Sequence, residues 1–235
     1  GKRAANELLE NGGSELMKKI RALQPKDVLC LKEIDKEQHT LALEMGLKLH
    51  DIEVLNLIPK YFELIHAQVV IVASSFGAKQ LKNFITRLPE TMWIVGQKAT
   101  ELLLNYGYTG NIRVFKNSGE LVTAYKNEQP GSAVYCGAER TSQNWSEFGI
   151  EHIITYSNIA KPPRLARQQW DAILAFSPLG VKSALSENNF PKNTPIVCIG
   201  ERTAETAKAE NFTQVYPASQ PNFTTLLQIL KNELS

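Results

Sequence analysis

Residues 170–212 read WDAILAFSPLGVKSALSENNFPKNTPIVCIGERTAETAKAENF and contain two short apolar runs, each followed by an amphipathic segment. The first run, 172–176, ends at Ser177-Pro178, and the second, 196–199, ends at Gly200. Short buried strands that lead into helices are typical of a parallel α/β sheet. Because ligands bind beside the carboxyl ends of the strands in such sheets, these two turns are candidate binding positions.

The same order of elements occurs earlier in the chain. Residues 69–84, VVIVASSFGAKQLKNF, predict a strand, a turn at Ser75 and a helix. Residues 92–108, MWIVGQKATELLLNYGY, predict a strand, a turn at Gly96 and a helix. We therefore predict an α/β protein with two related parallel-sheet lobes, each with a serine at one strand end and a glycine at the next. General likeness among doubly wound sheets is the alternative explanation of the pattern.

Several motifs resemble one known family. AFSPLGV and PIVCIGERTAETA, within residues 175–207, resemble the C-terminal half of the uroporphyrinogen III synthase family. ITYSN at 154–158 resembles the family's tyrosine motif, and YCGAER at 135–140 resembles its glycine-containing strand end. ASQPNFTTLLQIL resembles its C-terminal helix entry. The resemblance spans about Asp27 to Leu234, and the order and spacing of the motifs carry it.

The resemblance implies a domain organisation in which the first lobe is discontinuous. We expect an N-terminal helical extension over 1–25, a first lobe over 26–55 and 157–235, and a second lobe over 56–156. Two crossing strands should join the lobes, one within residues 48–58 and one within 150–156. We also expect a short helix over 61–66 and another opening after the Pro-containing connection at 158–169.

Composition excludes several function classes. The net charge is +2, which does not suit a nucleic-acid polycation, and no run of about 18 apolar residues predicts a membrane span. The three cysteines lie far apart in strand-like runs, which favours reduced cytoplasmic thiols. The histidines have no metal-ligand spacing, and there is no P-loop, dinucleotide fingerprint or GxSxG elbow. We expect no metal and no cofactor.

The resembled family converts the linear tetrapyrrole hydroxymethylbilane into uroporphyrinogen III, with inversion of ring D and loss of water. That reaction needs no redox cofactor and no nucleophile, so catalysis should be mostly positioning. The resemblance implies that Tyr156 is the catalytic residue, as a general acid or hydrogen-bond donor to the leaving hydroxyl. A core tyrosine at a strand end is the structural alternative.

The substrate of that family carries eight carboxylates, which helix N-termini and basic side chains can bind. Ser177-Pro178 is equally explained as an N-cap followed by proline at the first helical position. Two places depart from the family pattern: Leu31-Lys32 stands where Thr-Arg is common, and Arg202 stands where a hydroxyl residue is common. The substrate-binding candidates are Lys32, Ser75, Gly96, Gly137, Arg140, Ser177, Pro178, Gly180, Gly200, Arg202 and Thr203.

Two further questions concern partners. LLENGGSELMKKI at 8–20 resembles the end of porphobilinogen deaminase, so a deaminase–synthase fusion and a plain helical extension are both open. The resembled family favours monomers. The competing function is a non-enzymatic two-lobed binding module or sensor for a small anionic ligand.

Overall fold

The computed structural model describes residues 24–141 and 143–234. The chain divides into two compact units. The first combines the described residues up to Val54 with those from Pro162 onward, and the second runs from Leu55 to Lys161. The helices predicted within residues 2–23 lie outside the described residues.

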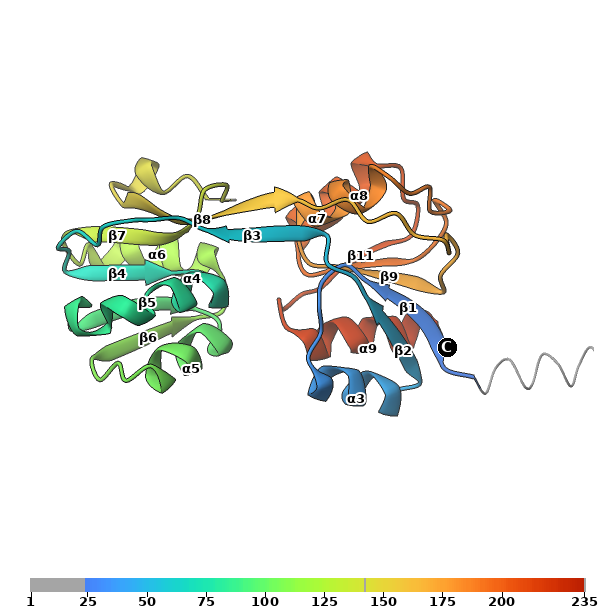
Figure 1. The fold of residues 1–235 in the computed structure, drawn as a ribbon, viewed down its shortest axis with the longest axis horizontal. Coiled ribbons are helices and arrows are strands. Elements are labelled where there is room, and N and C mark those ends of the chain that lie inside the picture. Colours follow the sequence, from blue (N-terminus) through green and yellow to red (C-terminus); the bar gives the residue numbers. More distant parts are fainter. Residues whose placement is uncertain (1–23, 142, 235) are drawn as a thin grey trace, which may run out of the picture. The chain divides into compact units, whose positions relative to one another are not determined.

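The first unit is a five-stranded parallel sheet in the order β11-β10-β9-β1-β2. Figure 1 shows α3 and α9 on one face of this sheet and α7 and α8 on the other. Its strands are β1 (Lys26–Cys30), β2 (Leu47–Asp51), β9 (Ala172–Ala175), β10 (Ile196–Cys198) and β11 (Val215–Pro217). Its helices are α3 (Lys36–Glu44), α7 (Pro178–Leu185), α8 (Glu201–Ala209) and α9 (Phe223–Glu233).

The second unit is a six-stranded sheet in the order β3-β8-β7-β4-β5-β6, parallel except for the antiparallel pair β3–β8 (Figure 1). Its strands are β3 (Leu55–Pro59), β4 (Val69–Val72), β5 (Thr91–Val95), β6 (Asn111–Phe115), β7 (Ala133–Ala138) and β8 (Glu151–Ala160). Its helices are α4 (Ser75–Gln80), α5 (Gln97–Asn105) and α6 (Ser118–Glu128), with 3₁₀ turns η2 (Lys82–Arg87) and η3 (Trp145–Phe148).

These sheets confirm the predicted fold class. The strands of the first sheet come from the beginning and the end of the described chain, as a discontinuous lobe requires. The two units also share a strand arrangement, because β9 lies between β1 and β10 as β4 lies between β7 and β5. Fully buried strands such as β4 and β9 carry only apolar residues, which is typical of parallel strands covered on both faces.

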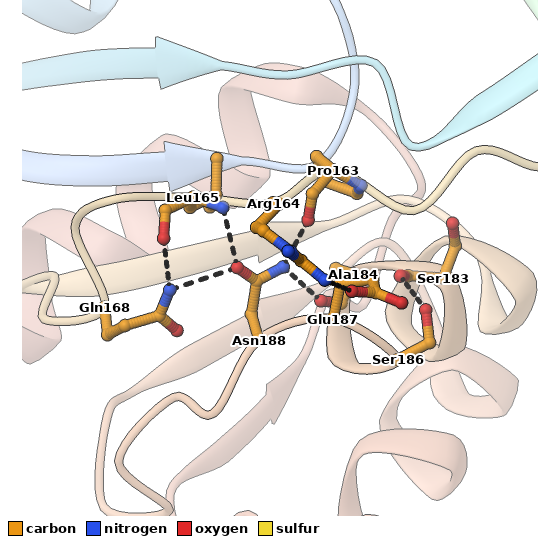
Figure 2. Close-up of polar contacts among 9 residues, drawn as sticks. All are labelled: Pro163, Arg164, Leu165, Gln168, Ser183, Ala184, Ser186, Glu187 and Asn188. Atoms are coloured by element: carbon orange, nitrogen blue, oxygen red, sulfur yellow. Dashed lines mark hydrogen bonds and ion pairs between the residues drawn. The ribbon is translucent and has the colours of Figure 1, made fainter.

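Three local predictions were wrong. Residues 48–58 are not one crossing strand, because they contain the end of β2 in the first sheet and most of β3 in the second. Residues 61–66 are not helical: Phe62 and Leu64 pack on the core while Tyr61 and Ile65 are exposed, which is the two-residue alternation of an extended chain. No helix opens after the predicted connection at 158–169. Its first three residues end β8, the following residues to Asp171 are not helical, and backbone groups of Pro163 and Leu165 bind the Asn188 side chain (Figure 2).

A serine turn recurs in the two units. The hydroxyl of Ser74 caps α4 by accepting from the amide of Gly77 at 2.9 Å, and Ser177 caps α7 by accepting from Gly180 at 3.0 Å. The matching of Ser75 with Ser177 was therefore wrong by one residue, since Ser75 is the first residue of α4. The predicted N-cap role of Ser177, with Pro178 at the first helical position, is confirmed.

The two glycine turns differ in backbone conformation. Gly96, the N-cap of α5, has φ = 89°, in the region that side chains rarely adopt. Gly200, the N-cap of α8, has φ = 179°, which is extended backbone open to any residue. A Cβ added at either glycine would have no atom within 4 Å. The backbone therefore requires glycine at the first turn but not at the second.

This difference predicts unequal costs for the same substitution. Gly96→Ala should lower the free energy of unfolding by about 1 kcal/mol more than Gly200→Ala, because only Gly96 has positive φ. Any loss of N-cap preference on going from glycine to alanine is common to both variants and cancels in the comparison. Urea unfolding followed by circular dichroism measures it, and equal losses would contradict the assignment.

Candidate functional site

Tyr156 lies near the carboxyl edge of the second sheet, where β8 pairs with both of its neighbours. It is opposite Ala138 of β7 and Pro59 of β3. Its hydroxyl is 3.0 Å from the Ser74 hydroxyl, and its ring meets the Phe76 ring edge-on at a centroid distance of 4.8 Å. Only 7% of Tyr156 is exposed. The residue predicted to be catalytic is therefore held by the turn at the start of α4.

A β-bulge in the pairing of β7 with β8 determines the direction of the Tyr156 side chain. The register of β7 against β8 passes from Gly137–Ile154 to Ala138–Tyr156 and skips Thr155. Thr155 is fully buried, and its hydroxyl donates to the Gly137 carbonyl at 3.3 Å. Without the extra residue, simple alternation would place Tyr156 on the face opposite to Ile153. The bulge instead turns Tyr156 toward α4, whose Ala78 packs in the same core cluster as Ile153.

The surroundings keep Tyr156 protonated. Burial raises the pKa of its phenol above the ordinary value of 10.0, and the hydrogen bond with Ser74 opposes this only in part. The Ser74 oxygen already accepts from the Gly77 amide, and the Ser74 hydroxyl can donate its proton to the Tyr156 oxygen. In that arrangement the Tyr156 proton is available to a ligand. The pair can therefore donate hydrogen bonds at neutral pH.

Charged groups follow β7 at the same edge. The pKa of Glu139 is lowered by the hydrogen bond from Ser157, at 2.6 Å, and by the positive charges of Lys60 and Arg140. The backbone amide of Glu139 donates to the Tyr156 carbonyl at 2.8 Å, which fixes this turn beside β8. Arg140 is exposed, so its guanidinium can reach a ligand in solution.

The two glycines predicted as binding residues in the second unit, Gly96 and Gly137, differ in their position relative to the strand ends. Gly96 begins α5 at the strand end, as expected. Gly137 lies inside β7 rather than at its end, and the Tyr135 hydroxyl occupies the space that a Cβ would need. The structure thus gives Gly137 a packing role.

The first unit places its candidates at the carboxyl ends of β1, β9 and β10. The ammonium of Lys32 lies 5.4 Å from the centroid of the Phe176 ring, just before Ser177. Arg202 is exposed in the first turn of α8, whereas the neighbouring Thr203 is only 3% exposed. Of the two, Arg202 is therefore the one that can reach a ligand.

Among residues 24–141 and 143–234 no group of three or more His, Cys, Asp or Glu side chains could hold a metal ion. In the same ranges, no helix has the length and apolar character that crossing a membrane requires. Cys30, Cys136 and Cys198 are all buried, and burial raises the pKa of each thiol, that of Cys136 and of Cys198 to about 12. These thiols are therefore poor nucleophiles at neutral pH.

Comparison with protein families gives a match to the model described as Uroporphyrinogen-III synthase HemD over residues 56–228, well over half of the chain. The chain belongs to this family. The match includes Tyr156, the two serine turns and both glycine turns. No curated protein sequence matches the chain significantly.

Solved structures of uroporphyrinogen III synthases have a similar fold. The enzyme from Helicobacter pylori 26695 is 15% identical, with a TM-score of 0.61 over 88% of this chain and 99% of that one. A mutant of the enzyme from the extremely thermophilic bacterium Thermus thermophilus is 14% identical, with a TM-score of 0.51 over 89% of this chain and 98% of that one. At these identities the likeness supports the architecture of the HemD family chain and not individual side-chain roles.

Sequence reasoning missed Ser74 and Phe76, whose side chains contact the phenol of Tyr156. A signal for Ser74 was present: SSFG at 74–77 and SPLG at 177–180 share a serine followed three residues later by glycine. Aligning the two lobes on that spacing would have selected Ser74 instead of Ser75. The contact with Phe76 depends on the bulge at Thr155, for which the sequence offers no comparable signal.

The environment of Tyr156 predicts its titration. The difference in tyrosinate absorbance between the wild type and Tyr156→Phe should report a pKa above 10.0, because burial disfavours the phenolate. Ser74→Ala should raise that pKa further, because the Ser74 hydrogen bond lowers it. A titration at or below the ordinary tyrosine value would contradict the buried, hydrogen-bonded placement.

Proposed function

We propose that this chain catalyses the cyclisation of hydroxymethylbilane to uroporphyrinogen III, with inversion of ring D and loss of water. Membership of the HemD family supports the reaction. The observation that carries the proposed site is the Tyr156–Ser74 hydroxyl pair, 3.0 Å apart at the carboxyl edge of the second sheet. Buried hydroxyls at a strand end suit a reaction that needs a proton donor and no cofactor.

Tyr156 is proposed to donate a hydrogen bond or proton to the terminal hydroxyl of the bilane, which leaves as water. The resulting azafulvene then reacts with ring D, and the macrocycle closes through a spiro intermediate. A neutral phenol suits this step, because its raised pKa keeps the proton in place until a leaving group needs it. Ser74 holds the phenol in position, and the Phe76 ring restricts its rotation.

Substrate carboxylates are proposed to bind at the carboxyl ends of strands in both units. The helices α5, α7 and α8 begin there, and each exposed helix N-terminus contributes only about 0.3–1 kcal/mol to binding an anion. Several such ends together with basic side chains give useful affinity. The proposed binding residues are Lys32, Ser75, Gly96, Arg140, Ser177, Pro178, Gly180, Gly200 and Arg202, with Gly137 and Thr203 acting through packing.

The cellular location, the partners and the oligomeric state of the protein are also part of the proposal. Three buried cysteines support a reducing, cytoplasmic location. The likeness of residues 8–20 to the end of porphobilinogen deaminase, the enzyme that supplies hydroxymethylbilane, supports a fused or associated deaminase. The full-length gene sequence tests the fusion, and sedimentation of the purified protein tests the expected monomer.

The deciding assay couples the protein to porphobilinogen and porphobilinogen deaminase and separates the oxidised products into uroporphyrin I and III. Without a synthase the bilane closes spontaneously to the type I isomer, so a synthase should give mainly type III. Type I product alone from folded protein would reject the enzyme and leave the two-lobed binding module as the better explanation.

Tyr156→Phe should lower kcat on the order of a hundredfold, because it removes a proton donor and leaves the ring in place. Tyr125→Phe is the matched control: it removes a hydroxyl that donates to the Gly131 carbonyl at 3.2 Å in the same unit. The control should lose about 1 kcal/mol of stability and little activity. Equal kcat in the two variants would assign Tyr156 to the core alone.

Arg202→Ala should raise KM by about threefold to tenfold with kcat nearly unchanged, because it removes a charge that contributes to uniform binding of the substrate. Lys208→Ala, at the other end of the same helix, is the control for net charge and helix stability. The rise in KM should shrink at high salt, because exposed charges are screened. A KM that rises equally in both variants would indicate only a general charge effect.

A further inference from the structure

Two buried hydroxyl groups flank Tyr156 along β8. Among the described residues of the second unit, the buried serine and threonine residues are Thr100, Thr155 and Ser157. Thr155 is fully buried, and Ser157 is 3% exposed. Serine and threonine are mostly exposed in proteins, and buried hydroxyls are kept where they make specific hydrogen bonds. The partners of these two hydroxyls therefore indicate what they do beside the proposed acid.

Both hydroxyls bind the segment in which β7 ends. The Thr155 hydroxyl donates to the Gly137 carbonyl at 3.3 Å. The Ser157 hydroxyl donates to a carboxylate oxygen of Glu139 at 2.6 Å. One residue separates the two acceptors, and the two donors are likewise separated by Tyr156 alone. The two bonds thus lie on either side of the proposed acid.

Backbone pairing alone is reduced at this point of β8. The Tyr156 carbonyl accepts from the Glu139 amide at 2.8 Å, and the Thr155 carbonyl accepts from the Lys60 amide at 3.0 Å. Pro59 of β3, opposite Tyr156, has no N–H to donate. The bulge also interrupts the regular ladder with β7. The side-chain bonds therefore supply attachment where the backbone supplies less of it.

The bond between Ser157 and Glu139 is charge-assisted. This hydrogen bond lowers the pKa of the Glu139 carboxyl below its usual value, and the positive charges of Lys60 and Arg140 lower it further. Glu139 is therefore ionised at neutral pH. A hydroxyl that donates to a carboxylate typically lies at about 2.5–2.7 Å and binds more strongly than one that donates to a neutral group. The 2.6 Å separation here fits that class of bond.

The two bonds favour one register of β8 against β7. In the observed register Tyr156 is opposite Ala138, and its phenol reaches Ser74. A shift by one residue would reverse the alternation of side chains and turn the phenol to the other face of the sheet. It would also move both hydroxyls away from their acceptors. Apolar side chains of similar size would fill the space without this preference, because hydrogen bonds depend on direction.

We propose that Thr155 and Ser157 are positioning residues for the cyclisation, an inference that rests on the proposed function. Their hydroxyl bonds fix the bulge of β8, and the bulge directs the Tyr156 phenol toward the turn that begins α4. Neither hydroxyl is among the proposed substrate-binding groups. Loss of either bond should leave substrate binding intact and make the position of the phenol less precise, which lowers the rate.

Ser157→Ala is the first test, because it removes one hydroxyl and creates no large cavity. We expect kcat to fall about tenfold with KM changed less than about twofold, since misplacement lowers the rate without removing binding contacts. Ser183→Ala is the matched control: it removes a buried serine hydroxyl that donates to the Val54 carbonyl at 2.7 Å within the first unit. The control should lose a similar amount of stability and keep the wild-type kcat.

Glu139→Ala removes the acceptor of the same bond and tests whether Ser157 acts through it. Each single variant should lower kcat by a similar factor. The double variant Ser157→Ala/Glu139→Ala should be no slower than either single variant, because the bond is already lost. If the two factors instead multiply in the double variant, the residues act independently and the bond is not the cause.

Two substitutions of Thr155 separate its hydroxyl from its packing. Thr155→Val keeps the shape but removes the donor, so kcat should fall about tenfold or more, since the Gly137 carbonyl also loses its partner. Thr155→Ser keeps the donor and should retain most of the wild-type kcat. An equal loss in both variants would assign the effect to packing. If Thr155→Val does not fold, Ser157→Ala and its control decide the question.

The position of the phenol can also be measured without the reaction. The ring centroids of Tyr156 and Phe76 are 4.8 Å apart, so nuclear Overhauser spectra of the wild type should contain cross-peaks between their ring protons. Tyr156→Phe assigns these cross-peaks by removing the tyrosine signals. They should weaken in Ser157→Ala and Thr155→Val, and they should keep the wild-type intensity in Ser183→Ala and Thr155→Ser.

The outcomes separate the two hypotheses. An active wild type whose kcat is unaffected by Ser157→Ala, or falls equally in Ser183→Ala, would overturn the positioning role and leave the synthase function standing. A fall in kcat with unchanged cross-peaks would also overturn it, because the phenol would not have moved. Type I isomer alone from the wild type would reject the synthase function and, with it, this role. A selective fall in kcat together with selectively weakened cross-peaks would support the inference.

Discussion

In both units a helix closely approaches a neighbouring segment at a glycine, where the absence of a side chain leaves room for the contact. Gly77 lies where a Cβ would be 3.2 Å from the Cys136 carbonyl of β7, and Gly180 lies where a Cβ would be 3.2 Å from Val54. Each glycine is also the donor to the serine that caps its helix. The spacing of serine and glycine therefore sets two things at once: the helix starts at the strand end, and its first turn is pressed against the rest of the unit.

The proposed site depends on the capping hydroxyl of this helix turn, Ser74 in the second unit. In the second unit the capping hydroxyl lies beside the Tyr156 phenol, because a bulge at Thr155 reverses the alternation of β8 just before the tyrosine. Burial then raises the pKa of the phenol and keeps it neutral. For the proposed reaction, a neutral phenol can offer a hydrogen bond to the departing hydroxyl of the substrate. In that proposal the bulge matters because it turns Tyr156 toward Ser74.

Sequence patterns predicted the strands and helices that depend on local periodicity. They failed for segments whose conformation is determined by tertiary contacts. Apolar runs ending at Ser177 and Gly200 correctly gave parallel strands leading into helices, because burial on both faces selects such runs. The polar connection at 158–169 suggested that a helix follows, but in the folded chain the side chains of Asn188 and Gln168 bind the backbone of this segment. The prediction for residues 61–66 failed for a different reason. In so short a segment Phe62 and Ile65 fit the spacing of a helix, whereas Phe62 and Leu64 fit the two-residue spacing that the structure shows. Tyr156 was selected through family resemblance, and its partner Ser74 was missed by one position.

The proposed site, which consists largely of helix ends and one tyrosine, would place few demands on side-chain identity. Backbone amides at the start of α5, α7 and α8 are present whatever residues follow, so anion binding there tolerates substitution as long as the turns keep their shape. Substitution should be tolerated less well at residues that maintain the conformation of these turns. Gly180 illustrates this, because an added Cβ there would lie 3.0 Å from the Ser177 hydroxyl oxygen and 3.2 Å from the Cγ2 atom of Val54.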